Sequence, residues 1–304
     1  MTIRDARSWG QDFLTKSPTP GLDADVLLMA VTGRDRTDLL FKGGEVLAPA
    51  VEADFRAYIQ ARSTGLPVAY ITGHKEFYGY DFLVTPDVLI PKPDTEILVE
   101  KTLSVIREKL SAKKGRILTF CDMCTGSACV GISVARAAWE EGLVTRENAL
   151  ALTLCDISGA ALDVARSNAD RLCPPFLREK VRLVRSNLFQ AVTGSFDIIT
   201  ANPPYIPAEE VEGLLADGRN EPRLALNGDI DLLGNPTGEG DGLGIMRNLV
   251  PQACGHLAPA GVLLVEAGEY NAEMTEYLFR EAGLKDTGIA KDLAGQLRCV
   301  YGRS

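Results

Sequence analysis

The sequence predicts an α/β protein whose larger part is a doubly wound, mostly parallel sheet of seven strands, preceded by a small helical domain and a β-hairpin linker. From residue 115 onward, short apolar runs alternate with helical stretches. Repeated β–α units of this length are typical of a parallel sheet with helices on both faces. Over residues 2–64, by contrast, the apolar residues recur at helical spacing. A chain of 304 residues with 46% apolar residues has enough material for two such parts.

The N-terminal part is expected to contain four helices. Proline and glycine separate them at residues 17–21, at Gly33 and at Gly43-Gly44, and the fourth helix begins near Pro49. These breaks favour a compact bundle of short helices.

Alternating apolar residues and glycines follow, in runs at 68–73, 76–79 and 80–84. Period-two alternation interrupted by glycine predicts a hairpin. We therefore expect three regions, which are a helical domain at 1–73, a hairpin linker at 74–92 and a sheet domain at 93–304.

The sheet domain is expected to alternate strands and helices to its end. The expected strands are 116–121, 151–155, 181–184, 196–201, 261–266, 286–290 and 297–302. The expected helices are 95–110, 130–139, 159–172, 243–257 and 271–282. The last two strands are joined by a link of only a few residues, which predicts an antiparallel pair at the sheet edge.

The net charge of −9 is unevenly distributed. Residues 1–75 carry 9 basic and 9 acidic residues, whereas residues 209–243 carry 9 acidic residues and only Arg219 and Arg223. An acidic segment of this kind disfavours binding of a nucleic-acid backbone, whose phosphates need cationic partners. A solvated acidic loop without any steering role is an equally good interpretation.

Composition also indicates a compartment. The first residues show no apolar core of a signal peptide, and no run of about 18 apolar residues could span a membrane. Seven scattered cysteines form no disulfide framework, so we expect reduced thiols in the cytoplasm.

The tetrapeptide Asn202-Pro203-Pro204-Tyr205 directly follows the expected strand 196–201. Two prolines end the strand, and a residue before proline is held extended. The carbonyl groups at 203 and 204 have no competing N–H donor on the same residue, and Asn202 adds an acceptor and two donors. A stiff loop at the carboxyl end of a parallel strand is where open α/β sheets bind ligands. The tetrapeptide therefore suits binding of a planar NH2 group, although a purely structural turn is the alternative.

A second candidate site lies at the ends of the first three strands of the sheet domain. The turn 122–128 contains small residues and opens a helix, so that its backbone can approach a ligand. Asp156 ends the next strand, where an acidic residue can accept hydrogen bonds from ribose hydroxyls. The stretch Ser186-Asn187-Leu188-Phe189, just after the third strand, is expected to be able to contact an adenine edge. The sequence has no glycine–lysine phosphate loop, so these features favour a nucleoside ligand without a triphosphate.

Together these features resemble the class I methyltransferases that use S-adenosylmethionine, which have a Rossmann-like methyltransferase sheet. More closely, the chain is similar to the protein-(glutamine-N5) methyltransferases that act on peptide chain release factors in translation termination (PrmC/HemK). The similarity extends over nearly the whole chain, and its motifs are 22–28, 65–79, 88–96, 202–205 and 221–226. The tetrapeptide is shared with adenine-N6 methyltransferases, whereas its combination with residues 90–96 is highly specific.

The resemblance implies a role for each candidate residue. The cofactor's methionine end and ribose would lie against the turn that contains Asp122, Cys124, Thr125, Gly126, Ser127 and Ala128. Asp156 would bind the ribose hydroxyls and Asn187 or Leu188 the adenine. Asn202 and the Pro203 carbonyl would bind the amide of the glutamine in a Gly-Gly-Gln loop, with Pro204 and Tyr205 packing beside it. The implied partner is a release factor bound by the helical domain, with no nucleic-acid substrate and no membrane.

The implied chemistry follows from the amide group itself. An amide nitrogen is a poor nucleophile because its lone pair is delocalised. Acceptors on both of its N–H groups hold it in line with the sulfonium methyl and favour the charge that develops on it. The sulfonium supplies the leaving group, the neutral thioether S-adenosylhomocysteine, so no metal is needed. The loop offers no dedicated general base.

Four features depart from the family pattern. Ala128 replaces the usual glycine, Asn187 the usual aspartate and Lys92 the commoner arginine, and residues 227–241 are longer and richer in glycine and aspartate. The methyl group of Ala128 is either tolerated or crowds the ligand. Three alternative functions therefore stay open, which are glutamine methylation of a ribosomal protein, adenine-N6 methylation, and a protein-binding role with weak cofactor affinity.

Overall fold

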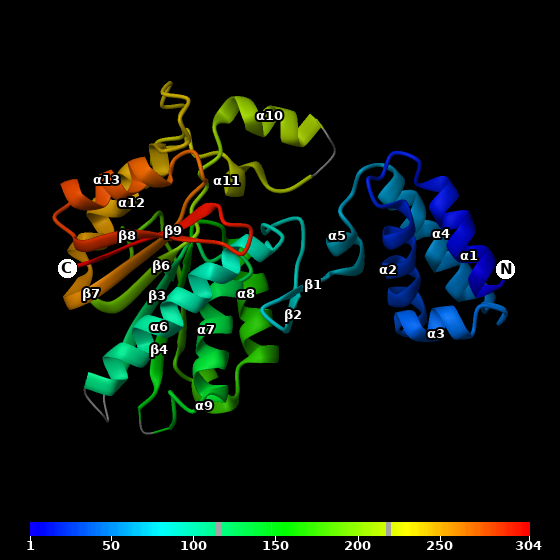
Figure 1. The fold of residues 1–304 in the computed structure, drawn as a ribbon, viewed down its shortest axis with the longest axis horizontal. Helices are drawn as coiled ribbons and strands as arrows, with labels where there is room; N and C mark the ends of the chain where they lie inside the picture. Colours follow the sequence, from blue (N-terminus) through cyan, green and yellow to red (C-terminus); the bar gives the residue numbers. More distant parts are fainter. Residues whose placement is uncertain (113–116, 147, 217–219) are drawn as a thin grey trace. The chain divides into compact units, whose positions relative to one another are not determined.

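The structure is a computed structural model that describes residues 1–112, 117–146, 148–216 and 220–304 (Figure 1). Residue 116, the expected start of the first strand of the sheet, and Arg219 of the acidic segment lie outside the described residues. The chain divides into two compact units, Met1–His74 with Gly213–Asn220, and Lys75–Glu212 with Glu221–Ser304.

The first unit is built on the helices α1 (Ile3–Phe13), α2 (Pro20–Thr32), α3 (Arg36–Phe41), α4 (Pro49–Ser63) and α5 (Val68–Thr72). A capping box between Thr2 and Asp5 starts α1, and Gly33 in the left-handed conformation ends α2. Buried apolar side chains, among them Leu28 and Phe55, form the core of the unit. The four expected helices are confirmed.

The expected strand-like run at 68–73 is wrong, because residues 68–72 form helix α5. Pro67 fixes a φ of −57° at the N-cap, and Gly73 ends the helix with a φ of 76°. The hairpin itself is formed by β1 (His74–Phe77) and β2 (Tyr80–Leu83). Tyr78 and Gly79 join these strands with φ values of 52° and 77°, as a two-residue turn with positive φ at both positions requires.

The second unit contains a seven-stranded sheet with the order β5-β4-β3-β6-β7-β9-β8. Its strands are β3 (Leu118–Met123), β4 (Leu150–Asp156), β5 (Val181–Arg185), β6 (Phe196–Ala201), β7 (Leu257–Glu266), β8 (Lys285–Lys291) and β9 (Leu297–Arg303). Strands β3 to β7 are parallel, and β9 is antiparallel to both of its neighbours. The expected doubly wound, mostly parallel sheet with a final antiparallel pair is confirmed, and β9 of that pair lies between β7 and β8.

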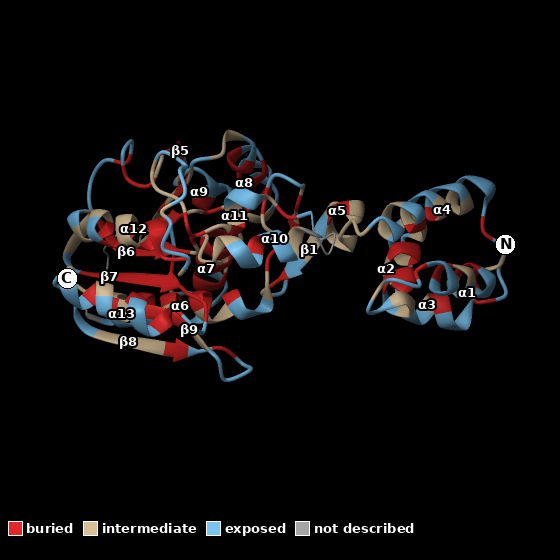
Figure 2. Ribbon diagram, turned by 90° about the horizontal axis from the view of Figure 1, so that it is seen from above, coloured by how far each residue is buried: buried red, intermediate tan, exposed pale blue. Residues whose placement is uncertain are grey.

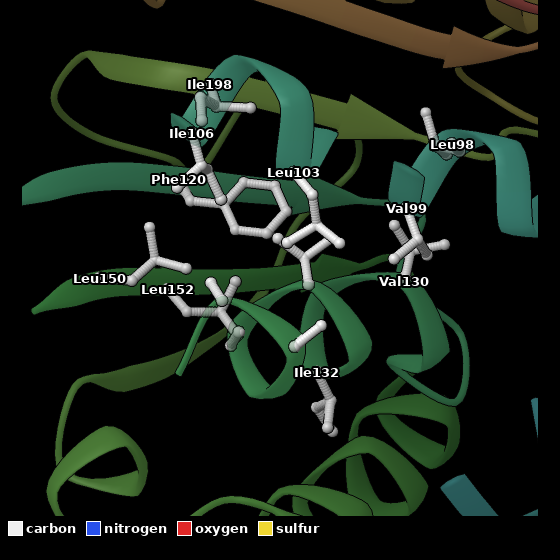
Figure 3. Close-up of a cluster of buried hydrophobic side chains, with 14 of the residues drawn as sticks. Leu98, Val99, Leu103, Ile106, Phe120, Val130, Ile132, Leu150, Leu152 and Ile198 are labelled. Carbon is white, nitrogen blue, oxygen red and sulfur yellow. The ribbon is translucent and has the colours of Figure 1, made fainter. Parts of the chain in front are cut away.

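Two layers of helices cover the sheet (Figures 1 and 2). The helices α6 (Glu96–Ala112), α7 (Cys129–Glu140) and α8 (Gly159–Leu172) pack on one face, and α12 (Gly244–Gly255) and α13 (Ala272–Glu281) on the other. Every residue of β6 is buried, as expected for a central strand covered on both faces. Figure 3 shows side chains of α6, β3 and α7 in this core cluster, with Leu103 of α6 beside Phe120 of β3.

Short elements connect these layers. They are η1 (Pro93–Thr95), α9 (Pro175–Arg178), α10 (Ala208–Ala216) and α11 (Arg223–Leu226). Across the described residues, none of the helices combines the length and the apolar content that a bilayer crossing requires.

The register of the parallel strands aligns the candidate site. Asp122 of β3 pairs with Thr200 of β6, and Met123 pairs with both Ala201 and Cys155. The loops that leave β3, β4 and β6 therefore start at the same edge of the sheet.

Candidate active site

A cavity of about 410 Å³ lies at the carboxyl ends of the parallel strands, within the second unit. This volume is within the usual range for small-molecule sites. The predicted residues that line the cavity are Asp122, Cys124, Thr125, Gly126, Ser127, Asp156, Asn187, Leu188, Asn202 and Pro204. The structure thus brings two separately predicted sites, the small-residue turn and the tetrapeptide, to one cavity.

The turn after β3 has an unusual backbone. Cys124, Gly126 and Ala128 have φ values of 56°, 53° and 63°. The left-handed conformation costs a residue other than glycine about 1–2 kcal/mol, so Cys124 and Ala128 hold strain that the surrounding packing must offset. Strain of this kind concentrates at functional sites. The three left-handed residues make the turn tight at the start of α7.

The carboxylate of Asp122, at the end of β3, holds this turn in place through hydrogen bonds. Its Oδ2 accepts hydrogen bonds from the Thr125 hydroxyl at 2.6 Å and from the Gly131 amide at 3.1 Å. Its Oδ1 accepts one from the Thr200 hydroxyl at 2.7 Å. Burial raises the pKa of Asp122 to about 6 against these hydrogen bonds. Because three protein donors already bind the carboxylate, its main role is to fix the conformation of the turn 122–128.

Asp156 connects the turn to the end of β4. Its Oδ2 accepts a hydrogen bond from the Gly126 amide and its Oδ1 one from the Ser158 amide, both at 2.9 Å. Burial raises the pKa of this carboxyl. Each oxygen keeps a further lone pair, so Asp156 can still accept hydrogen bonds from two ligand hydroxyls.

Ala128 does not belong to the cavity wall. Its side chain is fully buried and packs in the hydrophobic cluster between α6, α7 and the sheet. Its amide donates to the Thr125 carbonyl at 2.7 Å, which closes the turn. Of the two outcomes left open by the sequence, this placement favours a tolerated methyl group over a crowded ligand.

Asn187 contacts the glycine- and aspartate-rich segment 227–241. Its Nδ2 donates to the Leu232 carbonyl at 2.6 Å. Residues 230–234 of that segment form one wall of the cavity. Sequence reasoning missed this wall, although the unusual length of the segment was a signal for it.

The acidic residues of the segment stabilise their own loop. The Asp229 carboxylate accepts hydrogen bonds from the Ala208 amide at 2.9 Å and the Gly242 amide at 2.7 Å. The Asp231 carboxylate accepts hydrogen bonds from the Leu233 and Asn235 amides, each at 2.8 Å. These carboxylates therefore act as loop anchors, which is closer to the structural interpretation of the acidic segment than to a steering role.

The tetrapeptide has a defined hydrogen-bonding pattern. The Asn202 Nδ2 donates to the Thr95 hydroxyl oxygen at 3.3 Å, and the Tyr205 hydroxyl donates to Glu266 Oε1 at 3.0 Å. The Tyr205 carbonyl accepts hydrogen bonds from Asn271 Nδ2 and the Tyr270 hydroxyl, both at 3.1 Å. Neither Pro203 nor Tyr205 is part of the cavity wall, and sequence reasoning missed the partners of Asn202 and Tyr205.

A further wall comes from the segment before η1. Residues 86–89, 91 and 92 line the cavity. Buried Glu221 accepts hydrogen bonds from the Ile90 amide at 3.2 Å and from Lys92 Nζ at 2.8 Å. The contact joins the motifs 88–96 and 221–226, which are distant in sequence. The Lys92 ammonium is a compact charge, whereas an arginine could bind the carboxylate with two parallel hydrogen bonds.

The fold and this cavity define the protein as a class I methyltransferase. Residues 104–235 match the methyltransferase small domain family. The fold is similar to the hMettl16 catalytic domain, solved in complex with MAT2A 3'UTR hairpin 6, with a TM-score of 0.52 and 13% identity over 84% of this chain and 82% of that chain. At this identity the likeness concerns the fold alone.

Closer relatives identify the family. Residues 5–73 match the PrmC N-terminal domain family. The chain is 36% identical to the release factor glutamine methyltransferase of Bordetella pertussis, over 94% of this chain and 95% of that protein. It is 38% identical to the one of Moorella thermoacetica, over 92% and 90% of the two chains. The chain belongs to the release factor glutamine methyltransferase family.

Proposed function

We propose that the protein transfers a methyl group from S-adenosylmethionine to the side-chain amide nitrogen (N5) of the glutamine in the Gly-Gly-Gln motif of a peptide chain release factor. Relatives that share most of its length are named release factor glutamine methyltransferase. The observation that carries the proposal is the orientation of Asn202. Because its Nδ2 is directed at Thr95, its Oδ1 is turned the other way and can accept a hydrogen bond from a substrate N–H.

The cavity fits the cofactor by its chemistry. The turn 122–127 faces the expected position of the methionine end and ribose, and Asp156 has lone pairs for the two ribose hydroxyls. Leu188, Ile230 and Leu232 supply apolar surface for a flat base. Bound S-adenosylmethionine would supply a methyl group on its sulfonium sulfur. The thioether that leaves when this methyl group is transferred is neutral, so no metal is needed.

The tetrapeptide would hold the substrate amide. Asn202 Oδ1 and the Pro203 carbonyl would each accept one N–H of the amide, which favours positive charge on the nitrogen during transfer. The rigid prolines fix the distance between these acceptors. Tyr205, hydrogen-bonded to Glu266, would pack beside the amide without taking its proton, and the nitrogen would lose that proton to water after the methyl transfer.

The remaining assignments concern the whole chain. We assign partner recognition to residues 1–73, a linker role to 74–92 and the chemistry to 93–304; the family match at residues 5–73 supports the bounds of the first region. All seven cysteines are unpaired, which accords with a cytoplasmic enzyme.

The test is incubation of the protein with labelled S-adenosylmethionine and, in separate reactions, purified release factors, ribosomal proteins and DNA. Mass spectrometry of the Gly-Gly-Gln peptide is expected to find one added methyl on the glutamine. Label found only in ribosomal protein or only in nucleic acid would overturn the proposal in favour of that substrate. Absence of measurable cofactor binding by calorimetry would overturn it in favour of a protein-binding role.

A further inference from the structure

The main chain of Tyr205, the last residue of the tetrapeptide, packs directly against two buried glycines. A β-carbon on Gly242 would overlap the Tyr205 carbonyl oxygen and would lie 2.8 Å from its carbonyl carbon. A β-carbon on Gly228 would lie 2.8 Å from the Tyr205 Cα and would overlap the Gly242 carbonyl oxygen. Gly242 also has a φ of 72°, which glycine adopts without strain. The chain can therefore follow its present path only if both residues lack a side chain.

Two side chains also hold the Tyr205 carbonyl that Gly242 covers. The Tyr270 hydroxyl and Asn271 Nδ2 each donate a hydrogen bond to its oxygen at 3.1 Å. A carbonyl oxygen has two lone pairs, and these two donors use both of them. This carbonyl is therefore not available to a substrate, and its contacts serve to fix the position of the peptide group.

The chain that follows the tetrapeptide is bound to the segment that carries these glycines. The Ile206 amide donates to the Leu226 carbonyl at 3.0 Å, and the Gly228 amide donates to the Ile206 carbonyl at 2.9 Å. The Gly242 amide in turn donates to Asp229 Oδ1 at 2.7 Å. Because Gly242 is anchored in this way, a side chain added there would displace its neighbour, the Tyr205 carbonyl, rather than move away from it.

We propose that Gly242 is a positioning residue for the methyl transfer, because its lack of a side chain fixes where the Tyr205 carbonyl lies. The two prolines before Tyr205 have a fixed φ, so they pass a displacement of Tyr205 back to Asn202 and the Pro203 carbonyl. These two groups are the acceptors proposed for the substrate amide, and a misplacement of about 1 Å at a reacting group can lower the rate about 10²-fold. The inference rests on the proposed function for the identity of the group that the acceptors bind, an amide N–H.

The inference is tested with Gly242→Ala in the full-length protein and with Gly240→Ala as the matched control. Gly240 has a φ of 69°, and a β-carbon there would meet nothing within 4 Å. Both substitutions thus introduce the same left-handed strain, but only the first displaces Tyr205.

Gly242→Ala is expected to lower kcat for methylation of a release factor about 10²-fold. The KM for the release factor and the Kd for S-adenosylmethionine should stay within about threefold, since one side-chain amide supplies few of the contacts of a protein substrate. Gly240→Ala should keep kcat within about twofold. A normal kcat in folded Gly242→Ala, or an equal loss in Gly240→Ala, would overturn the inference.

A milder variant, Tyr270→Phe, loosens the same carbonyl without crowding it. The substitution removes only the hydroxyl that donates to the Tyr205 carbonyl, and the ring is largely exposed, so the fold should be kept. The loss of one of two donors is expected to lower kcat about threefold to tenfold. The control is Tyr277→Phe, on α13, because this tyrosine is similarly exposed and its hydroxyl has no hydrogen bond among the described residues. If Gly242→Ala does not fold, an unchanged kcat in Tyr270→Phe overturns the inference.

A second measurement does not depend on the release factor. The Tyr205 carbonyl and the Ile206 amide belong to one planar peptide group, so a displaced carbonyl also moves the amide away from the Leu226 carbonyl. In ¹⁵N-labelled protein, the Ile206 amide should therefore exchange with water about tenfold faster in Gly242→Ala and at an unchanged rate in Gly240→Ala. Amides of the central strand β3 report global opening and correct for a change in overall stability.

The exchange data separate two kinds of failure. An unchanged exchange of the Ile206 amide in Gly242→Ala would overturn the inference even if kcat falls. Faster exchange in Gly242→Ala, together with no methyl transfer to a release factor by the unmodified protein, would overturn the proposed function but not the positioning of the tetrapeptide by Gly242.

Discussion

The side-chain amide of Asn187 donates a hydrogen bond to the main-chain carbonyl of Leu232 at 2.6 Å. The contact links the loop after β5 to a wall of the cavity formed by residues 230–234. An aspartate at position 187 could not make it, because a carboxylate has no proton to give to a carbonyl. The asparagine and the unusual segment 227–241 are therefore structurally coupled, and they need not indicate a weakened cofactor site.

Replacement of Asn187 by Asp should consequently weaken cofactor binding. The new charge would face the Leu232 carbonyl and loosen the wall, at a cost of about 1–2 kcal/mol, or roughly a five- to thirtyfold rise in the Kd for S-adenosylmethionine. Isothermal titration calorimetry measures this directly. The control is Asn148→Asp, which removes a similar bond, from Asn148 Nδ2 to the Leu143 carbonyl in the connection before β4, away from the cavity wall. Tighter binding by Asn187→Asp would show instead that residue 187 contacts the adenine.

Ala128→Gly should leave cofactor affinity unchanged within about twofold, since the methyl group lies in the core. Two effects on stability oppose each other. Glycine removes about 1 kcal/mol of left-handed strain, but it loses the burial of one methyl group, worth about 0.8 kcal/mol, and makes the unfolded chain more flexible. The free energy of unfolding should therefore change by less than about 1 kcal/mol in urea titrations. A large gain in affinity would mean that the methyl group does crowd the ligand.

Asn202→Ala should bind S-adenosylmethionine nearly normally and lose turnover. The variant removes one of the two acceptors proposed for the substrate amide, and loss of such a group typically lowers kcat about 10²–10³-fold. Single-turnover assays with a release factor, alongside calorimetry with the cofactor, separate the two steps. Unchanged turnover would remove the amide-binding role assigned to Asn202.

The buried carboxyl of Asp122 should make stability depend on pH. Its pKa is raised from 3.8 to about 6 in the folded protein. Between these values the folded state keeps the proton that the unfolded state releases, so the contribution of Asp122 to stability falls as pH rises and is lost above pH 6. Relative to Asp122→Asn, the free energy of unfolding should decrease from pH 4 to pH 7 by up to about 3 kcal/mol. A relative increase over that range would show that the bonds from Thr125, Gly131 and Thr200 outweigh burial.

The sequence was most informative where a pattern is local. Short strand-like runs such as 196–201 predicted strands of a parallel sheet, and parallel register then placed Asp122 and Asn202 at one edge. The expectation failed at 68–72, where Pro67 and Gly73 delimit a helical turn whose alternation resembled a strand. Such short segments contain too few residues to distinguish the two periods.

The partners within the site could not be predicted in the same way. Thr95 and Asn202 are separated by 107 residues, and Tyr205 and Glu266 by 61. Their pairing depends on side-chain directions that only the packed sheet and helices define. The role of Asn187 was likewise hidden, because its acceptor is a main-chain carbonyl and any residue could supply it.

The two hydrogen bonds of Asp229 have a practical consequence. The Asp229 carboxylate binds the Gly242 amide and thereby holds the two ends of the loop 229–242 together. It also binds the Ala208 amide, which follows the tetrapeptide. Lengthening a loop whose ends are already held together costs little, about 0.6 kcal/mol for each doubling. Exposed positions near its tip, such as Leu233, therefore offer an attachment point for a fluorophore or a short insertion. A probe at that point would report movement of the cavity wall while the base of the loop keeps its anchor.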